Sequence, residues 1–163
     1  MGPISSVFAD DHRRLEALID GATAGLGPID RELFEQFRAG LLRHIGMEEK
    51  ILLPAAQRAS GGTPLAIARQ LRLDHGAIAA LLVPTPTPTT VGQLRALLAV
   101  HDVLEEAPGG AYEICDRLLG PESAALIEQV QNFPAVRTAP HNDGPLVERH
   151  IAQALALAGR ENL

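Results

Sequence analysis

The sequence predicts an all-α fold in which four main helices pair into a bundle and shorter helices follow them. Apolar residues recur at helical spacing over most of the 163 residues, and no alternating run of β-branched or aromatic residues is long enough for a strand. Aromatic residues make up only 3% of the chain and Trp is absent, so Leu and Ala must fill the core, as in helical bundles. The length suits one domain with a well-packed core.

The four main helices are expected from their start and stop signals, at about residues 5–23, 31–59, 64–83 and 91–106. Ser5 or Ser6 would cap the first helix and Asp30 the second, because short polar side chains accept hydrogen bonds from first-turn backbone N–H groups. Pro54 is expected to kink or end the second helix. Thr63, which precedes a proline, fits the N-cap of the third helix.

Proline-rich segments mark the remaining connections. Pro and Thr alternate at 84–90, which predicts a stiff, extended link before the fourth helix. Beyond it, shorter helices are expected at about residues 111–119, 121–131 and 145–158. We therefore expect residues 1–110 to form the bundle and residues 111–163 to form a helical extension packed on the same domain.

The first hundred residues carry an internal repeat of histidines and acidic residues. Each half begins with an Asp-His dipeptide, and its second helix has a His followed four residues later by Glu-Glu. Residues four apart lie nearly above each other on a helix, so each His and the first Glu after it share one face. Antiparallel helix pairs of this length dock into a four-helix bundle whose core can hold metals. The repeated segments are Asp11-His12 with His44 and Glu48-Glu49, and Asp74-His75 with His101 and Glu105-Glu106.

The inward face of each helix is expected to carry part of a metal site. By helical geometry, Glu49 and Glu106 turn about 140° from their histidines and should face outward. An ionised carboxylate in an apolar interior costs several kcal/mol unless it is paired or coordinated, and no Lys or Arg shares these inner faces. A pair of metal ions removes this cost, because carboxylates bridge metals and neutral imidazoles complete their shells. The residues expected to face inward are His12, His44, His75, His101, Glu48 and Glu105.

Each of these features alone has an ordinary structural explanation. A single inward His is more often a hydrogen-bonded core residue than a ligand, and a single His/Glu pair is usually a surface helix pair. Four inward histidines and two inward glutamates in a repeated unit favour a metal site over both explanations.

In combination these motifs resemble the hemerythrin-like (HHE cation-binding) family over about residues 8–108. Leu52-Leu53-Pro54 also looks like the end of that family's second helix. The ferritin-like pattern differs, because there Glu precedes His by three residues. The resemblance implies an up-down-up-down four-helix bundle with two non-heme iron ions joined by an oxo or hydroxo bridge, at donors that also suit other divalent metals. The ligands it implies are His12 and His44 for one iron, His75 and His101 for the other, and Glu48 and Glu105 as bridges.

The chain departs from the dioxygen carriers of this family at Ala79, where those proteins have a further His one turn after the third-helix histidine. The iron at His75 would therefore lack one protein ligand. Glu16, four residues after His12, is the counterpart on the first helix. Three roles are open for Glu16: an additional metal ligand, a hydrogen-bond partner of a ligand histidine, or a partly exposed helix residue. Fewer fixed ligands favour reactivity or metal exchange over reversible dioxygen carriage.

Four further residues have secondary roles in this interpretation. His141 is expected to be exposed in a Pro-rich loop and His150 to lie at the edge of an apolar stripe, and either could reach an open coordination position. Tyr112 could donate a hydrogen bond to an oxygen ligand of the metal. Cys115 is expected to pack as an apolar residue, and as the single cysteine it excludes an internal disulfide or a thiolate-cage zinc site.

Composition narrows the expected partners and location. The net charge is −6 and no basic stripe occurs, so nucleic acid is not an expected partner. No apolar stretch approaches the roughly 20 residues needed to span a bilayer, and no signal-peptide pattern is visible at the N-terminus. We therefore expect no membrane association and a cytoplasmic location. The sequence does not determine the oligomeric state.

Three functions follow from this interpretation. The leading one is a di-iron protein that binds dioxygen, nitric oxide or peroxide for sensing, storage or detoxification. The second is a di-iron enzyme that disproportionates peroxide, reduces nitric oxide or donates iron for cluster repair, activities found among hemerythrin-like proteins. The third is an interaction or regulatory module that the metal only stabilises.

Overall fold

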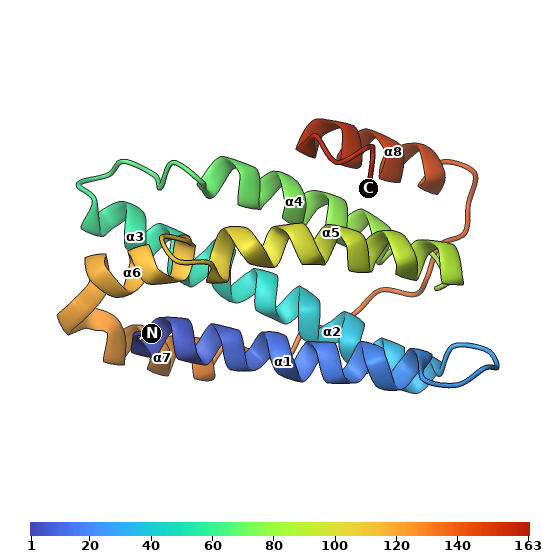
Figure 1. Ribbon diagram of the computed structural model, residues 1–163, viewed down its shortest axis with the longest axis horizontal. Helices are drawn as coiled ribbons and strands as arrows, with labels where there is room; N and C mark the ends of the chain where they lie inside the picture. The colour runs from blue at the N-terminus through green and yellow to red at the C-terminus, as the bar shows by residue number, and fades with distance from the viewer.

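In the computed structural model, which describes residues 1–163, the four main helical segments run side by side along the long axis of the molecule (Figure 1). The fold is an all-helical, hemerythrin-like bundle with extra C-terminal helices, as predicted, and contains no strand. The second segment is a continuous run of helix that is made of three parts. The segments are α1 (Pro3–Thr23), α2 (Arg31–Met47) with η1 (Glu48–Leu52) and α3 (Leu53–Ala59), α4 (Ala68–Leu81), and α5 (Pro88–Glu106).

Pro54 does not end the second helix but lies in its continuation α3, two residues after a widened π-helical turn, η1. A proline has no N–H to donate to the preceding turn, so the backbone hydrogen bonds change locally before it. The N–H of Leu53 donates to the carbonyl of Glu48 five residues earlier. The widened turn begins at Glu48, one of the expected site residues.

Three of the four main segments begin at another residue than predicted. Helix α1 begins at Pro3, because the carboxylate of Asp116, on helix α6 (Ala111–Leu119), accepts hydrogen bonds from the N–H groups of Ile4 and Ser5 at 2.8 and 3.1 Å. Helix α5 begins at Pro88, because Thr87 and Thr90 cap each other reciprocally. Residues 88–90 therefore belong to the helix and not to the extended link.

The expected N-cap at Thr63 is wrong, because α4 begins only at Ala68. The segment before it crosses the end of the bundle, and its side chains Leu65 and Ile67 pack against a cluster that contains Leu53 and Leu71. Burial of these two apolar side chains replaces the first turn of helix that the local sequence favours.

The C-terminal helices cover both ends of the bundle. Helices α6 and α7 lie near the N-terminus and pack against α1, whereas α8 lies along α4 at the opposite end (Figure 1). Their bounds are α6 (Ala111–Leu119), η2 (Gly120–Glu122), α7 (Ser123–Gln131) and α8 (Val147–Ala158). The last helix was expected from residue 145 and the one before it from residue 121, so both begin two residues late.

An extended segment, residues 132–146, connects α7 to α8 along the length of the bundle (Figure 1). Arg43 on α2 donates hydrogen bonds to the carbonyl of Phe133, and Arg38 donates one to the carbonyl of Ala139. These side chains fix the connection against α2, so α8 reaches its place on α4 by a defined path.

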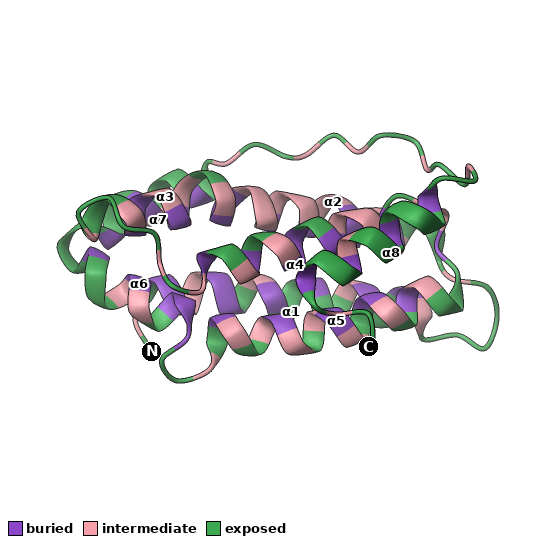
Figure 2. Cartoon of the chain, turned by 90° about the horizontal axis from the view of Figure 1, so that it is seen from above, coloured by how far each residue is buried: buried purple, intermediate pink, exposed green.

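Two large apolar clusters and the small one around Leu53 and Leu71 share the interior, which appears as purple bands on the inner faces of the helices in Figure 2. One cluster joins α1, α2, α4 and α5 to α8 through Ile151 and Leu155. The other joins α1 and the second segment to α6 and α7 through Cys115 and Leu126. Both clusters include residues from either side of residue 110, and Cys115 is fully buried as expected.

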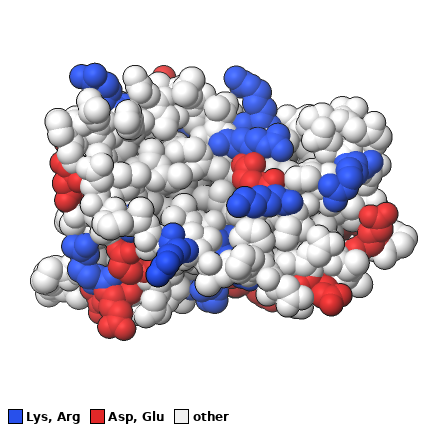
Figure 3. All heavy atoms as spheres, turned by 180° about the vertical axis from the view of Figure 1, so that it is seen from behind, with Lys and Arg blue, Asp and Glu red and all other residues white.

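The surface carries no concentrated charge on the face shown in Figure 3, where basic and acidic side chains are scattered among neutral ones. None of the helices is long and apolar enough to cross a membrane.

Candidate metal centre

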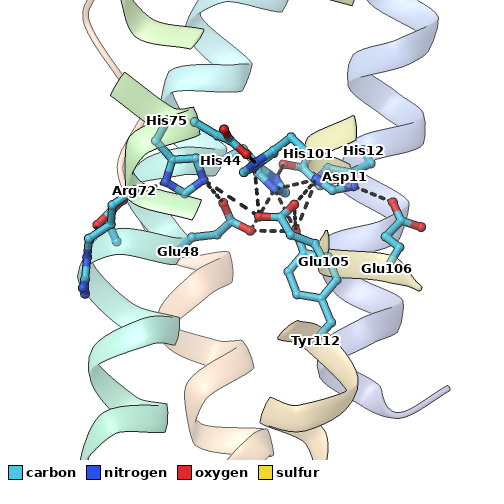
Figure 4. A network of polar contacts seen from close by, with 12 residues as sticks. Asp11, His12, His44, Glu48, Arg72, His75, His101, Glu105, Glu106 and Tyr112 are labelled. Atoms are coloured by element: carbon cyan, nitrogen blue, oxygen red, sulfur yellow. Dashed lines mark hydrogen bonds and ion pairs between the residues drawn. The ribbon is translucent and has the colours of Figure 1, made fainter. Parts of the chain in front are cut away.

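Four histidines, one from each main segment, meet between the two apolar clusters (Figure 4). His12 and His44 approach through their Nε2 atoms at 2.9 Å, and the rings of His75 and His101 lie 4.9 Å apart edge to face. All four residues are at most 6% exposed. Helical periodicity explains the inward direction, because each histidine lies on the apolar face of its own helix.

The carboxylates of Glu48 and Glu105 lie between the two histidine pairs. Glu48 has Oε1 3.5 Å from His44 Nε2 and Oε2 3.1 Å from His75 Nε2. Glu105 has Oε1 3.1 Å from His101 Nε2 and Oε2 3.4 Å from His12 Nε2. Each carboxylate therefore presents one oxygen to each pair, which is the arrangement that a bridging ligand needs.

These six residues form two groups whose potential ligand atoms lie within 4.8 Å of one another. The groups share Glu105. Glu16 belongs to neither group, is exposed, and lines the cavity beside the site. The groups are Glu48, His75, His101 and Glu105, and His12, His44 and Glu105.

Three buried atoms at the centre have no partner with acceptable hydrogen-bond geometry, although His75 Nε2 lies 3.1 Å from Glu48 Oε2 and 3.8 Å from Glu105 Oε1. They are Glu48 Oε2, His75 Nε2 and Glu105 Oε1. Buried polar atoms are nearly always satisfied, and a charged atom without a partner is especially costly. All three atoms belong to the four-residue group and face one another. Imidazole nitrogen and carboxylate oxygen are good donors for first-row transition metals, so the residues present fit a metal ion well.

A ring of four carboxylates surrounds the centre at the outer nitrogen, Nδ1, of the histidines. Each carboxylate comes from the helical segment next to that of the histidine. A carboxylate of α1 contacts the histidine of α2, one of η1 contacts that of α4, one of α4 contacts that of α5, and one of α5 contacts that of α1. A carboxylate at Nδ1 favours the proton on that nitrogen and leaves the Nε2 lone pair free for a metal. The pairs are Asp11–His44 (2.9 Å), Glu49–His75 (2.7 Å), Asp74–His101 (3.2 Å) and Glu106–His12 (2.5 Å).

Glu49 and Glu106 leave the inner face of their helices as predicted, Glu49 half-buried and Glu106 exposed. The sequence did not predict that each carboxylate also reaches the outer nitrogen of a histidine on the adjacent segment. Glu49 lies in the widened π turn, and the flexible stem of Glu106 carries its carboxylate back toward α1. The sequence signal was present, since an acidic residue is adjacent to a candidate ligand in all four motifs.

The carboxylates also control the charge of the rings when no metal is bound. Burial disfavours a charged His44, but Glu48 and Asp11 outweigh burial and raise the pKa of His44 to about 10. Similarly, carboxylates overcome burial and raise the pKa of His75 to about 11 and that of His101 to about 9. Metal binding must therefore displace protons from these rings, so metal affinity should increase with pH.

The C-terminal end of the chain contributes to this ring. Asp74, which is fully buried, accepts hydrogen bonds from Arg160 Nε and Nη2, both at 3.0 Å, and from Gln70 at 2.9 Å. Arg160 follows α8, which turns at Gly159 with a φ of +70°. Burial disfavours the Asp74 anion, but His101 and Arg160 together lower the pKa of Asp74 to about 2. Nothing in the sequence alone linked residue 160 to the site.

Tyr112 contacts the candidate metal ligands directly, whereas the sequence suggested only a possible hydrogen bond to an oxygen ligand of the metal. Its hydroxyl donates to Glu48 Oε1 at 2.6 Å and lies 3.0 Å from Glu105 Oε2. Burial first, and then the two carboxylates, raise the pKa of Tyr112. His141 and His150 lie outside the centre. His141 is only 12% exposed, not exposed as expected, because its Nε2 pairs with Glu35, whereas His150 is exposed on α8.

A cavity of about 230 Å³ adjoins the His12 and His44 rings. Its inner wall is apolar and includes Leu41 and Ile78, while exposed residues from α1 and α5, among them Glu16, line its outer part. The cavity thus connects the site to the surface between these two helices. A small, weakly polar molecule could enter by this route.

The fold and site together define a helical-bundle protein with a buried histidine and carboxylate centre suited to metal. Residues 4–83 match the family model described as the Hemerythrin HHE cation binding domain. This part of the chain is therefore hemerythrin-like, as the motifs indicated, and the match implies a metal cation. It spans the first three motifs but ends before His101 and Glu105, which the structure brings to the same centre. No significant match was found among curated proteins or solved structures.

Proposed function

We propose that the protein holds two iron ions in this centre and uses them to bind a small oxygen or nitrogen species. Dioxygen, nitric oxide and peroxide are the candidates, in a sensing, storage or detoxifying role. The observation that carries the proposal is the pair of buried donor groups that share Glu105, with three unpartnered donor atoms among them. The family resemblance favours iron among the metals that such donors accept.

The proposed ligand set follows the geometry of the two groups. Each histidine would bind through Nε2, since its Nδ1 is occupied by a carboxylate of the ring. When bound, the two irons would supply Lewis acidity and electrons for the small ligand. His12 and His44 would hold one iron, His75 and His101 the other, and Glu48 and Glu105 would bridge them.

The protein contributes orientation and restricted access. The ring carboxylates hold the histidine planes, so the donors are in place before a metal arrives. The two apolar clusters lie on either side of the centre, and the cavity provides an approach to it that borders His12, His44 and His101. Ala79 offers no donor on the His75 side, so protein ligands do not fill that metal's shell.

Iron content and charge-transfer absorption test this proposal. Reconstituted protein should hold two irons per chain and show near-ultraviolet bands of a bridged di-iron centre. Glu48→Ala and Glu105→Ala should each lose di-metal occupancy, whereas Glu128→Ala, which removes an exposed carboxylate on α7, should keep it. Substoichiometric iron without such bands in the unmodified protein would refute the proposal, and two irons in either bridging variant would refute the bridging assignment.

A di-iron enzyme is the second candidate, and the size of the cavity favours it. A volume of about 230 Å³ exceeds what a diatomic ligand needs, given that a water molecule occupies about 30 Å³ of liquid. Asp102 also lines this cavity, and burial raises its pKa to about 6. Turnover separates the candidates: many equivalents of peroxide or nitric oxide consumed per centre indicate an enzyme, and a single equivalent indicates binding.

A further inference from the structure

The hydroxyl oxygen of Tyr112 lies among four potential metal ligands on the His12 side of the centre (Figure 4). It is 3.2 Å from the Nε2 atoms of both His12 and His44, 3.0 Å from Glu105 Oε2 and 2.6 Å from Glu48 Oε1. Tyr112 is 1% exposed, so its hydroxyl lies in the protein interior.

The four neighbouring atoms are potential hydrogen-bond acceptors, whereas a phenol has only one proton to donate. The Nδ1 atoms of His12 and His44 face Glu106 and Asp11, so their Nε2 atoms present lone pairs toward Tyr112 when the rings are neutral. The carboxylates are acceptors as well. One O–H can satisfy only one acceptor, and the remaining lone pairs would face the phenol oxygen without a donor. In the metal-free protein the proton held by His44, whose pKa is raised to about 10, relieves this conflict. Once that proton is displaced, a metal cation beside the phenol oxygen attracts all of these lone pairs together.

The two donor groups are also unequal without Tyr112. The His75 group has four ligand residues, whereas the His12 group has three. Five of the six separations among His12 Nε2, His44 Nε2, Glu105 Oε2 and the Tyr112 oxygen, all except that from His44 to Glu105, run from 2.9 to 3.4 Å. With metal–ligand bonds of about 2.1 Å, neighbouring ligands in octahedral and tetrahedral shells lie about 3.0 and 3.4 Å apart. The tyrosine oxygen therefore fits as the fourth donor of this group.

The chain connection from α5 to α6 holds Tyr112 in this place. Gly109 has a φ of +80°, which favours glycine, and a Cβ on Gly110 would lie 2.6 Å from the carbonyl oxygen of Glu105. The tight turn brings Tyr112 back onto the centre seven residues after Glu105. Its ring stacks on Phe8, with centroids 5.1 Å apart.

We propose that Tyr112 is a protein ligand of the metal held by His12, His44 and Glu105, bound through its phenolate oxygen. Binding breaks the phenol O–H bond, forms the metal–oxygen bond from an oxygen lone pair and releases the proton to solvent, with no change of oxidation state. This inference rests on the proposed metal centre, but it assigns a donor from α6, beyond the residues that match the family.

Resonance Raman spectroscopy of the iron-loaded, air-oxidised protein tests the inference. Tyr112 is the only tyrosine of the chain and there is no Trp, so a phenolate signal has one source. We expect a visible charge-transfer band whose excitation enhances phenolate ring vibrations. Tyr112→Phe, which keeps the ring stacked on Phe8, should lose the band and retain one of its two irons at least about tenfold less tightly against a chelator. Cys115→Ala, which removes the buried thiol of α6, should keep the band.

The outcomes separate this inference from the proposed function. Two irons per chain without phenolate vibrations in the unmodified protein would overturn the inference and leave the di-iron proposal standing, with Tyr112 as a hydrogen-bond donor only. No bound iron would overturn both. If Tyr112→Phe does not fold, the spectrum of the unmodified protein decides alone, because no other residue can give the signal.

Discussion

Replacing Arg160 by Met is expected to destabilise the whole bundle, although Arg160 lies three residues from the C-terminal residue of the chain. Its guanidinium donates two hydrogen bonds of 3.0 Å to the Asp74 carboxylate, which is fully buried and faces His101. Met keeps most of the apolar stem of the side chain and removes the guanidinium, with its charge and both hydrogen bonds to Asp74. The variant therefore isolates the ion pair from the packing of the helix that precedes it.

The expected cost lies between those of buried and exposed ion pairs. Removing one partner of a buried pair costs about 3–5 kcal/mol, whereas exposed pairs contribute about 0.2–1 kcal/mol. The Arg160 side chain is 21% exposed, and Asp74 keeps Gln70 and His101 as partners. We expect a loss of about 2 kcal/mol, which lowers the Tm of a chain of this length by about 4–8 °C.

Thermal unfolding of the chelated protein at neutral pH measures this effect. Arg149→Met is the matched control, because Arg149 is exposed on α8 and forms no ion pair. The control should unfold at the temperature of the unmodified protein. Equal Tm values for the two variants would refute the reasoning, since Arg160 would then not hold Asp74 in place.

Three further predictions follow from the site and its cavity. Because the pKa values of His44 and His101 are raised to about 10 and about 9, their contribution to the stability of the metal-free protein is complete below the ordinary histidine pKa of about 6.5. It is lost as pH rises through the raised values, so the Tm of chelated protein should fall from about pH 6.5 to about pH 9.5, and a constant Tm would contradict this. Bound metal should stabilise the protein. At a free concentration of 100 times its Kd it adds about 2.7 kcal/mol to the free energy of unfolding, which raises the Tm by about 5–10 °C. Calorimetry would detect this increase, and a chelator should remove it. Leu98→Phe should narrow the cavity and slow nitric oxide binding several-fold in stopped-flow measurements, at unchanged iron content. The control Leu157→Phe, on the exposed face of α8, should not change the rate of nitric oxide binding. Equal rates for the two variants would exclude this entry route.

The helices and the candidate ligands could be predicted from local patterns. Each helix is specified by its own apolar spacing and caps, and a His four residues before a Glu shares its face in any helix. His12, His44, His75 and His101 therefore pointed to one interior before any packing was known. The errors in helix starts at Ala68 and Pro88 are also local, and they arose where burial or a reciprocal cap changed one turn.

The partners of those ligands could not be predicted, because they come from other helices. Glu49 lies in the π turn η1 and contacts His75 of α4 at 2.7 Å, a pairing that depends on how the two segments pack together. Helical geometry by itself says which way a side chain leaves its helix, but not which neighbour it meets. The outward direction predicted for Glu49 and Glu106 was therefore correct, but the histidines that they contact could not be predicted.

By itself, the sequence determined an all-helical bundle with four histidines and two glutamates turned inward, because helical periodicity is a property of neighbouring residues. Only the tertiary structure decided that the acidic residues of the motifs form a ring around the histidines and that Tyr112 and Arg160 reach the centre from beyond residue 110. The two residues in each of these contacts are 86 and 100 positions apart in the sequence, respectively for Arg160 and Tyr112. They depend on the rotation and register of packed helices, which no local pattern specifies.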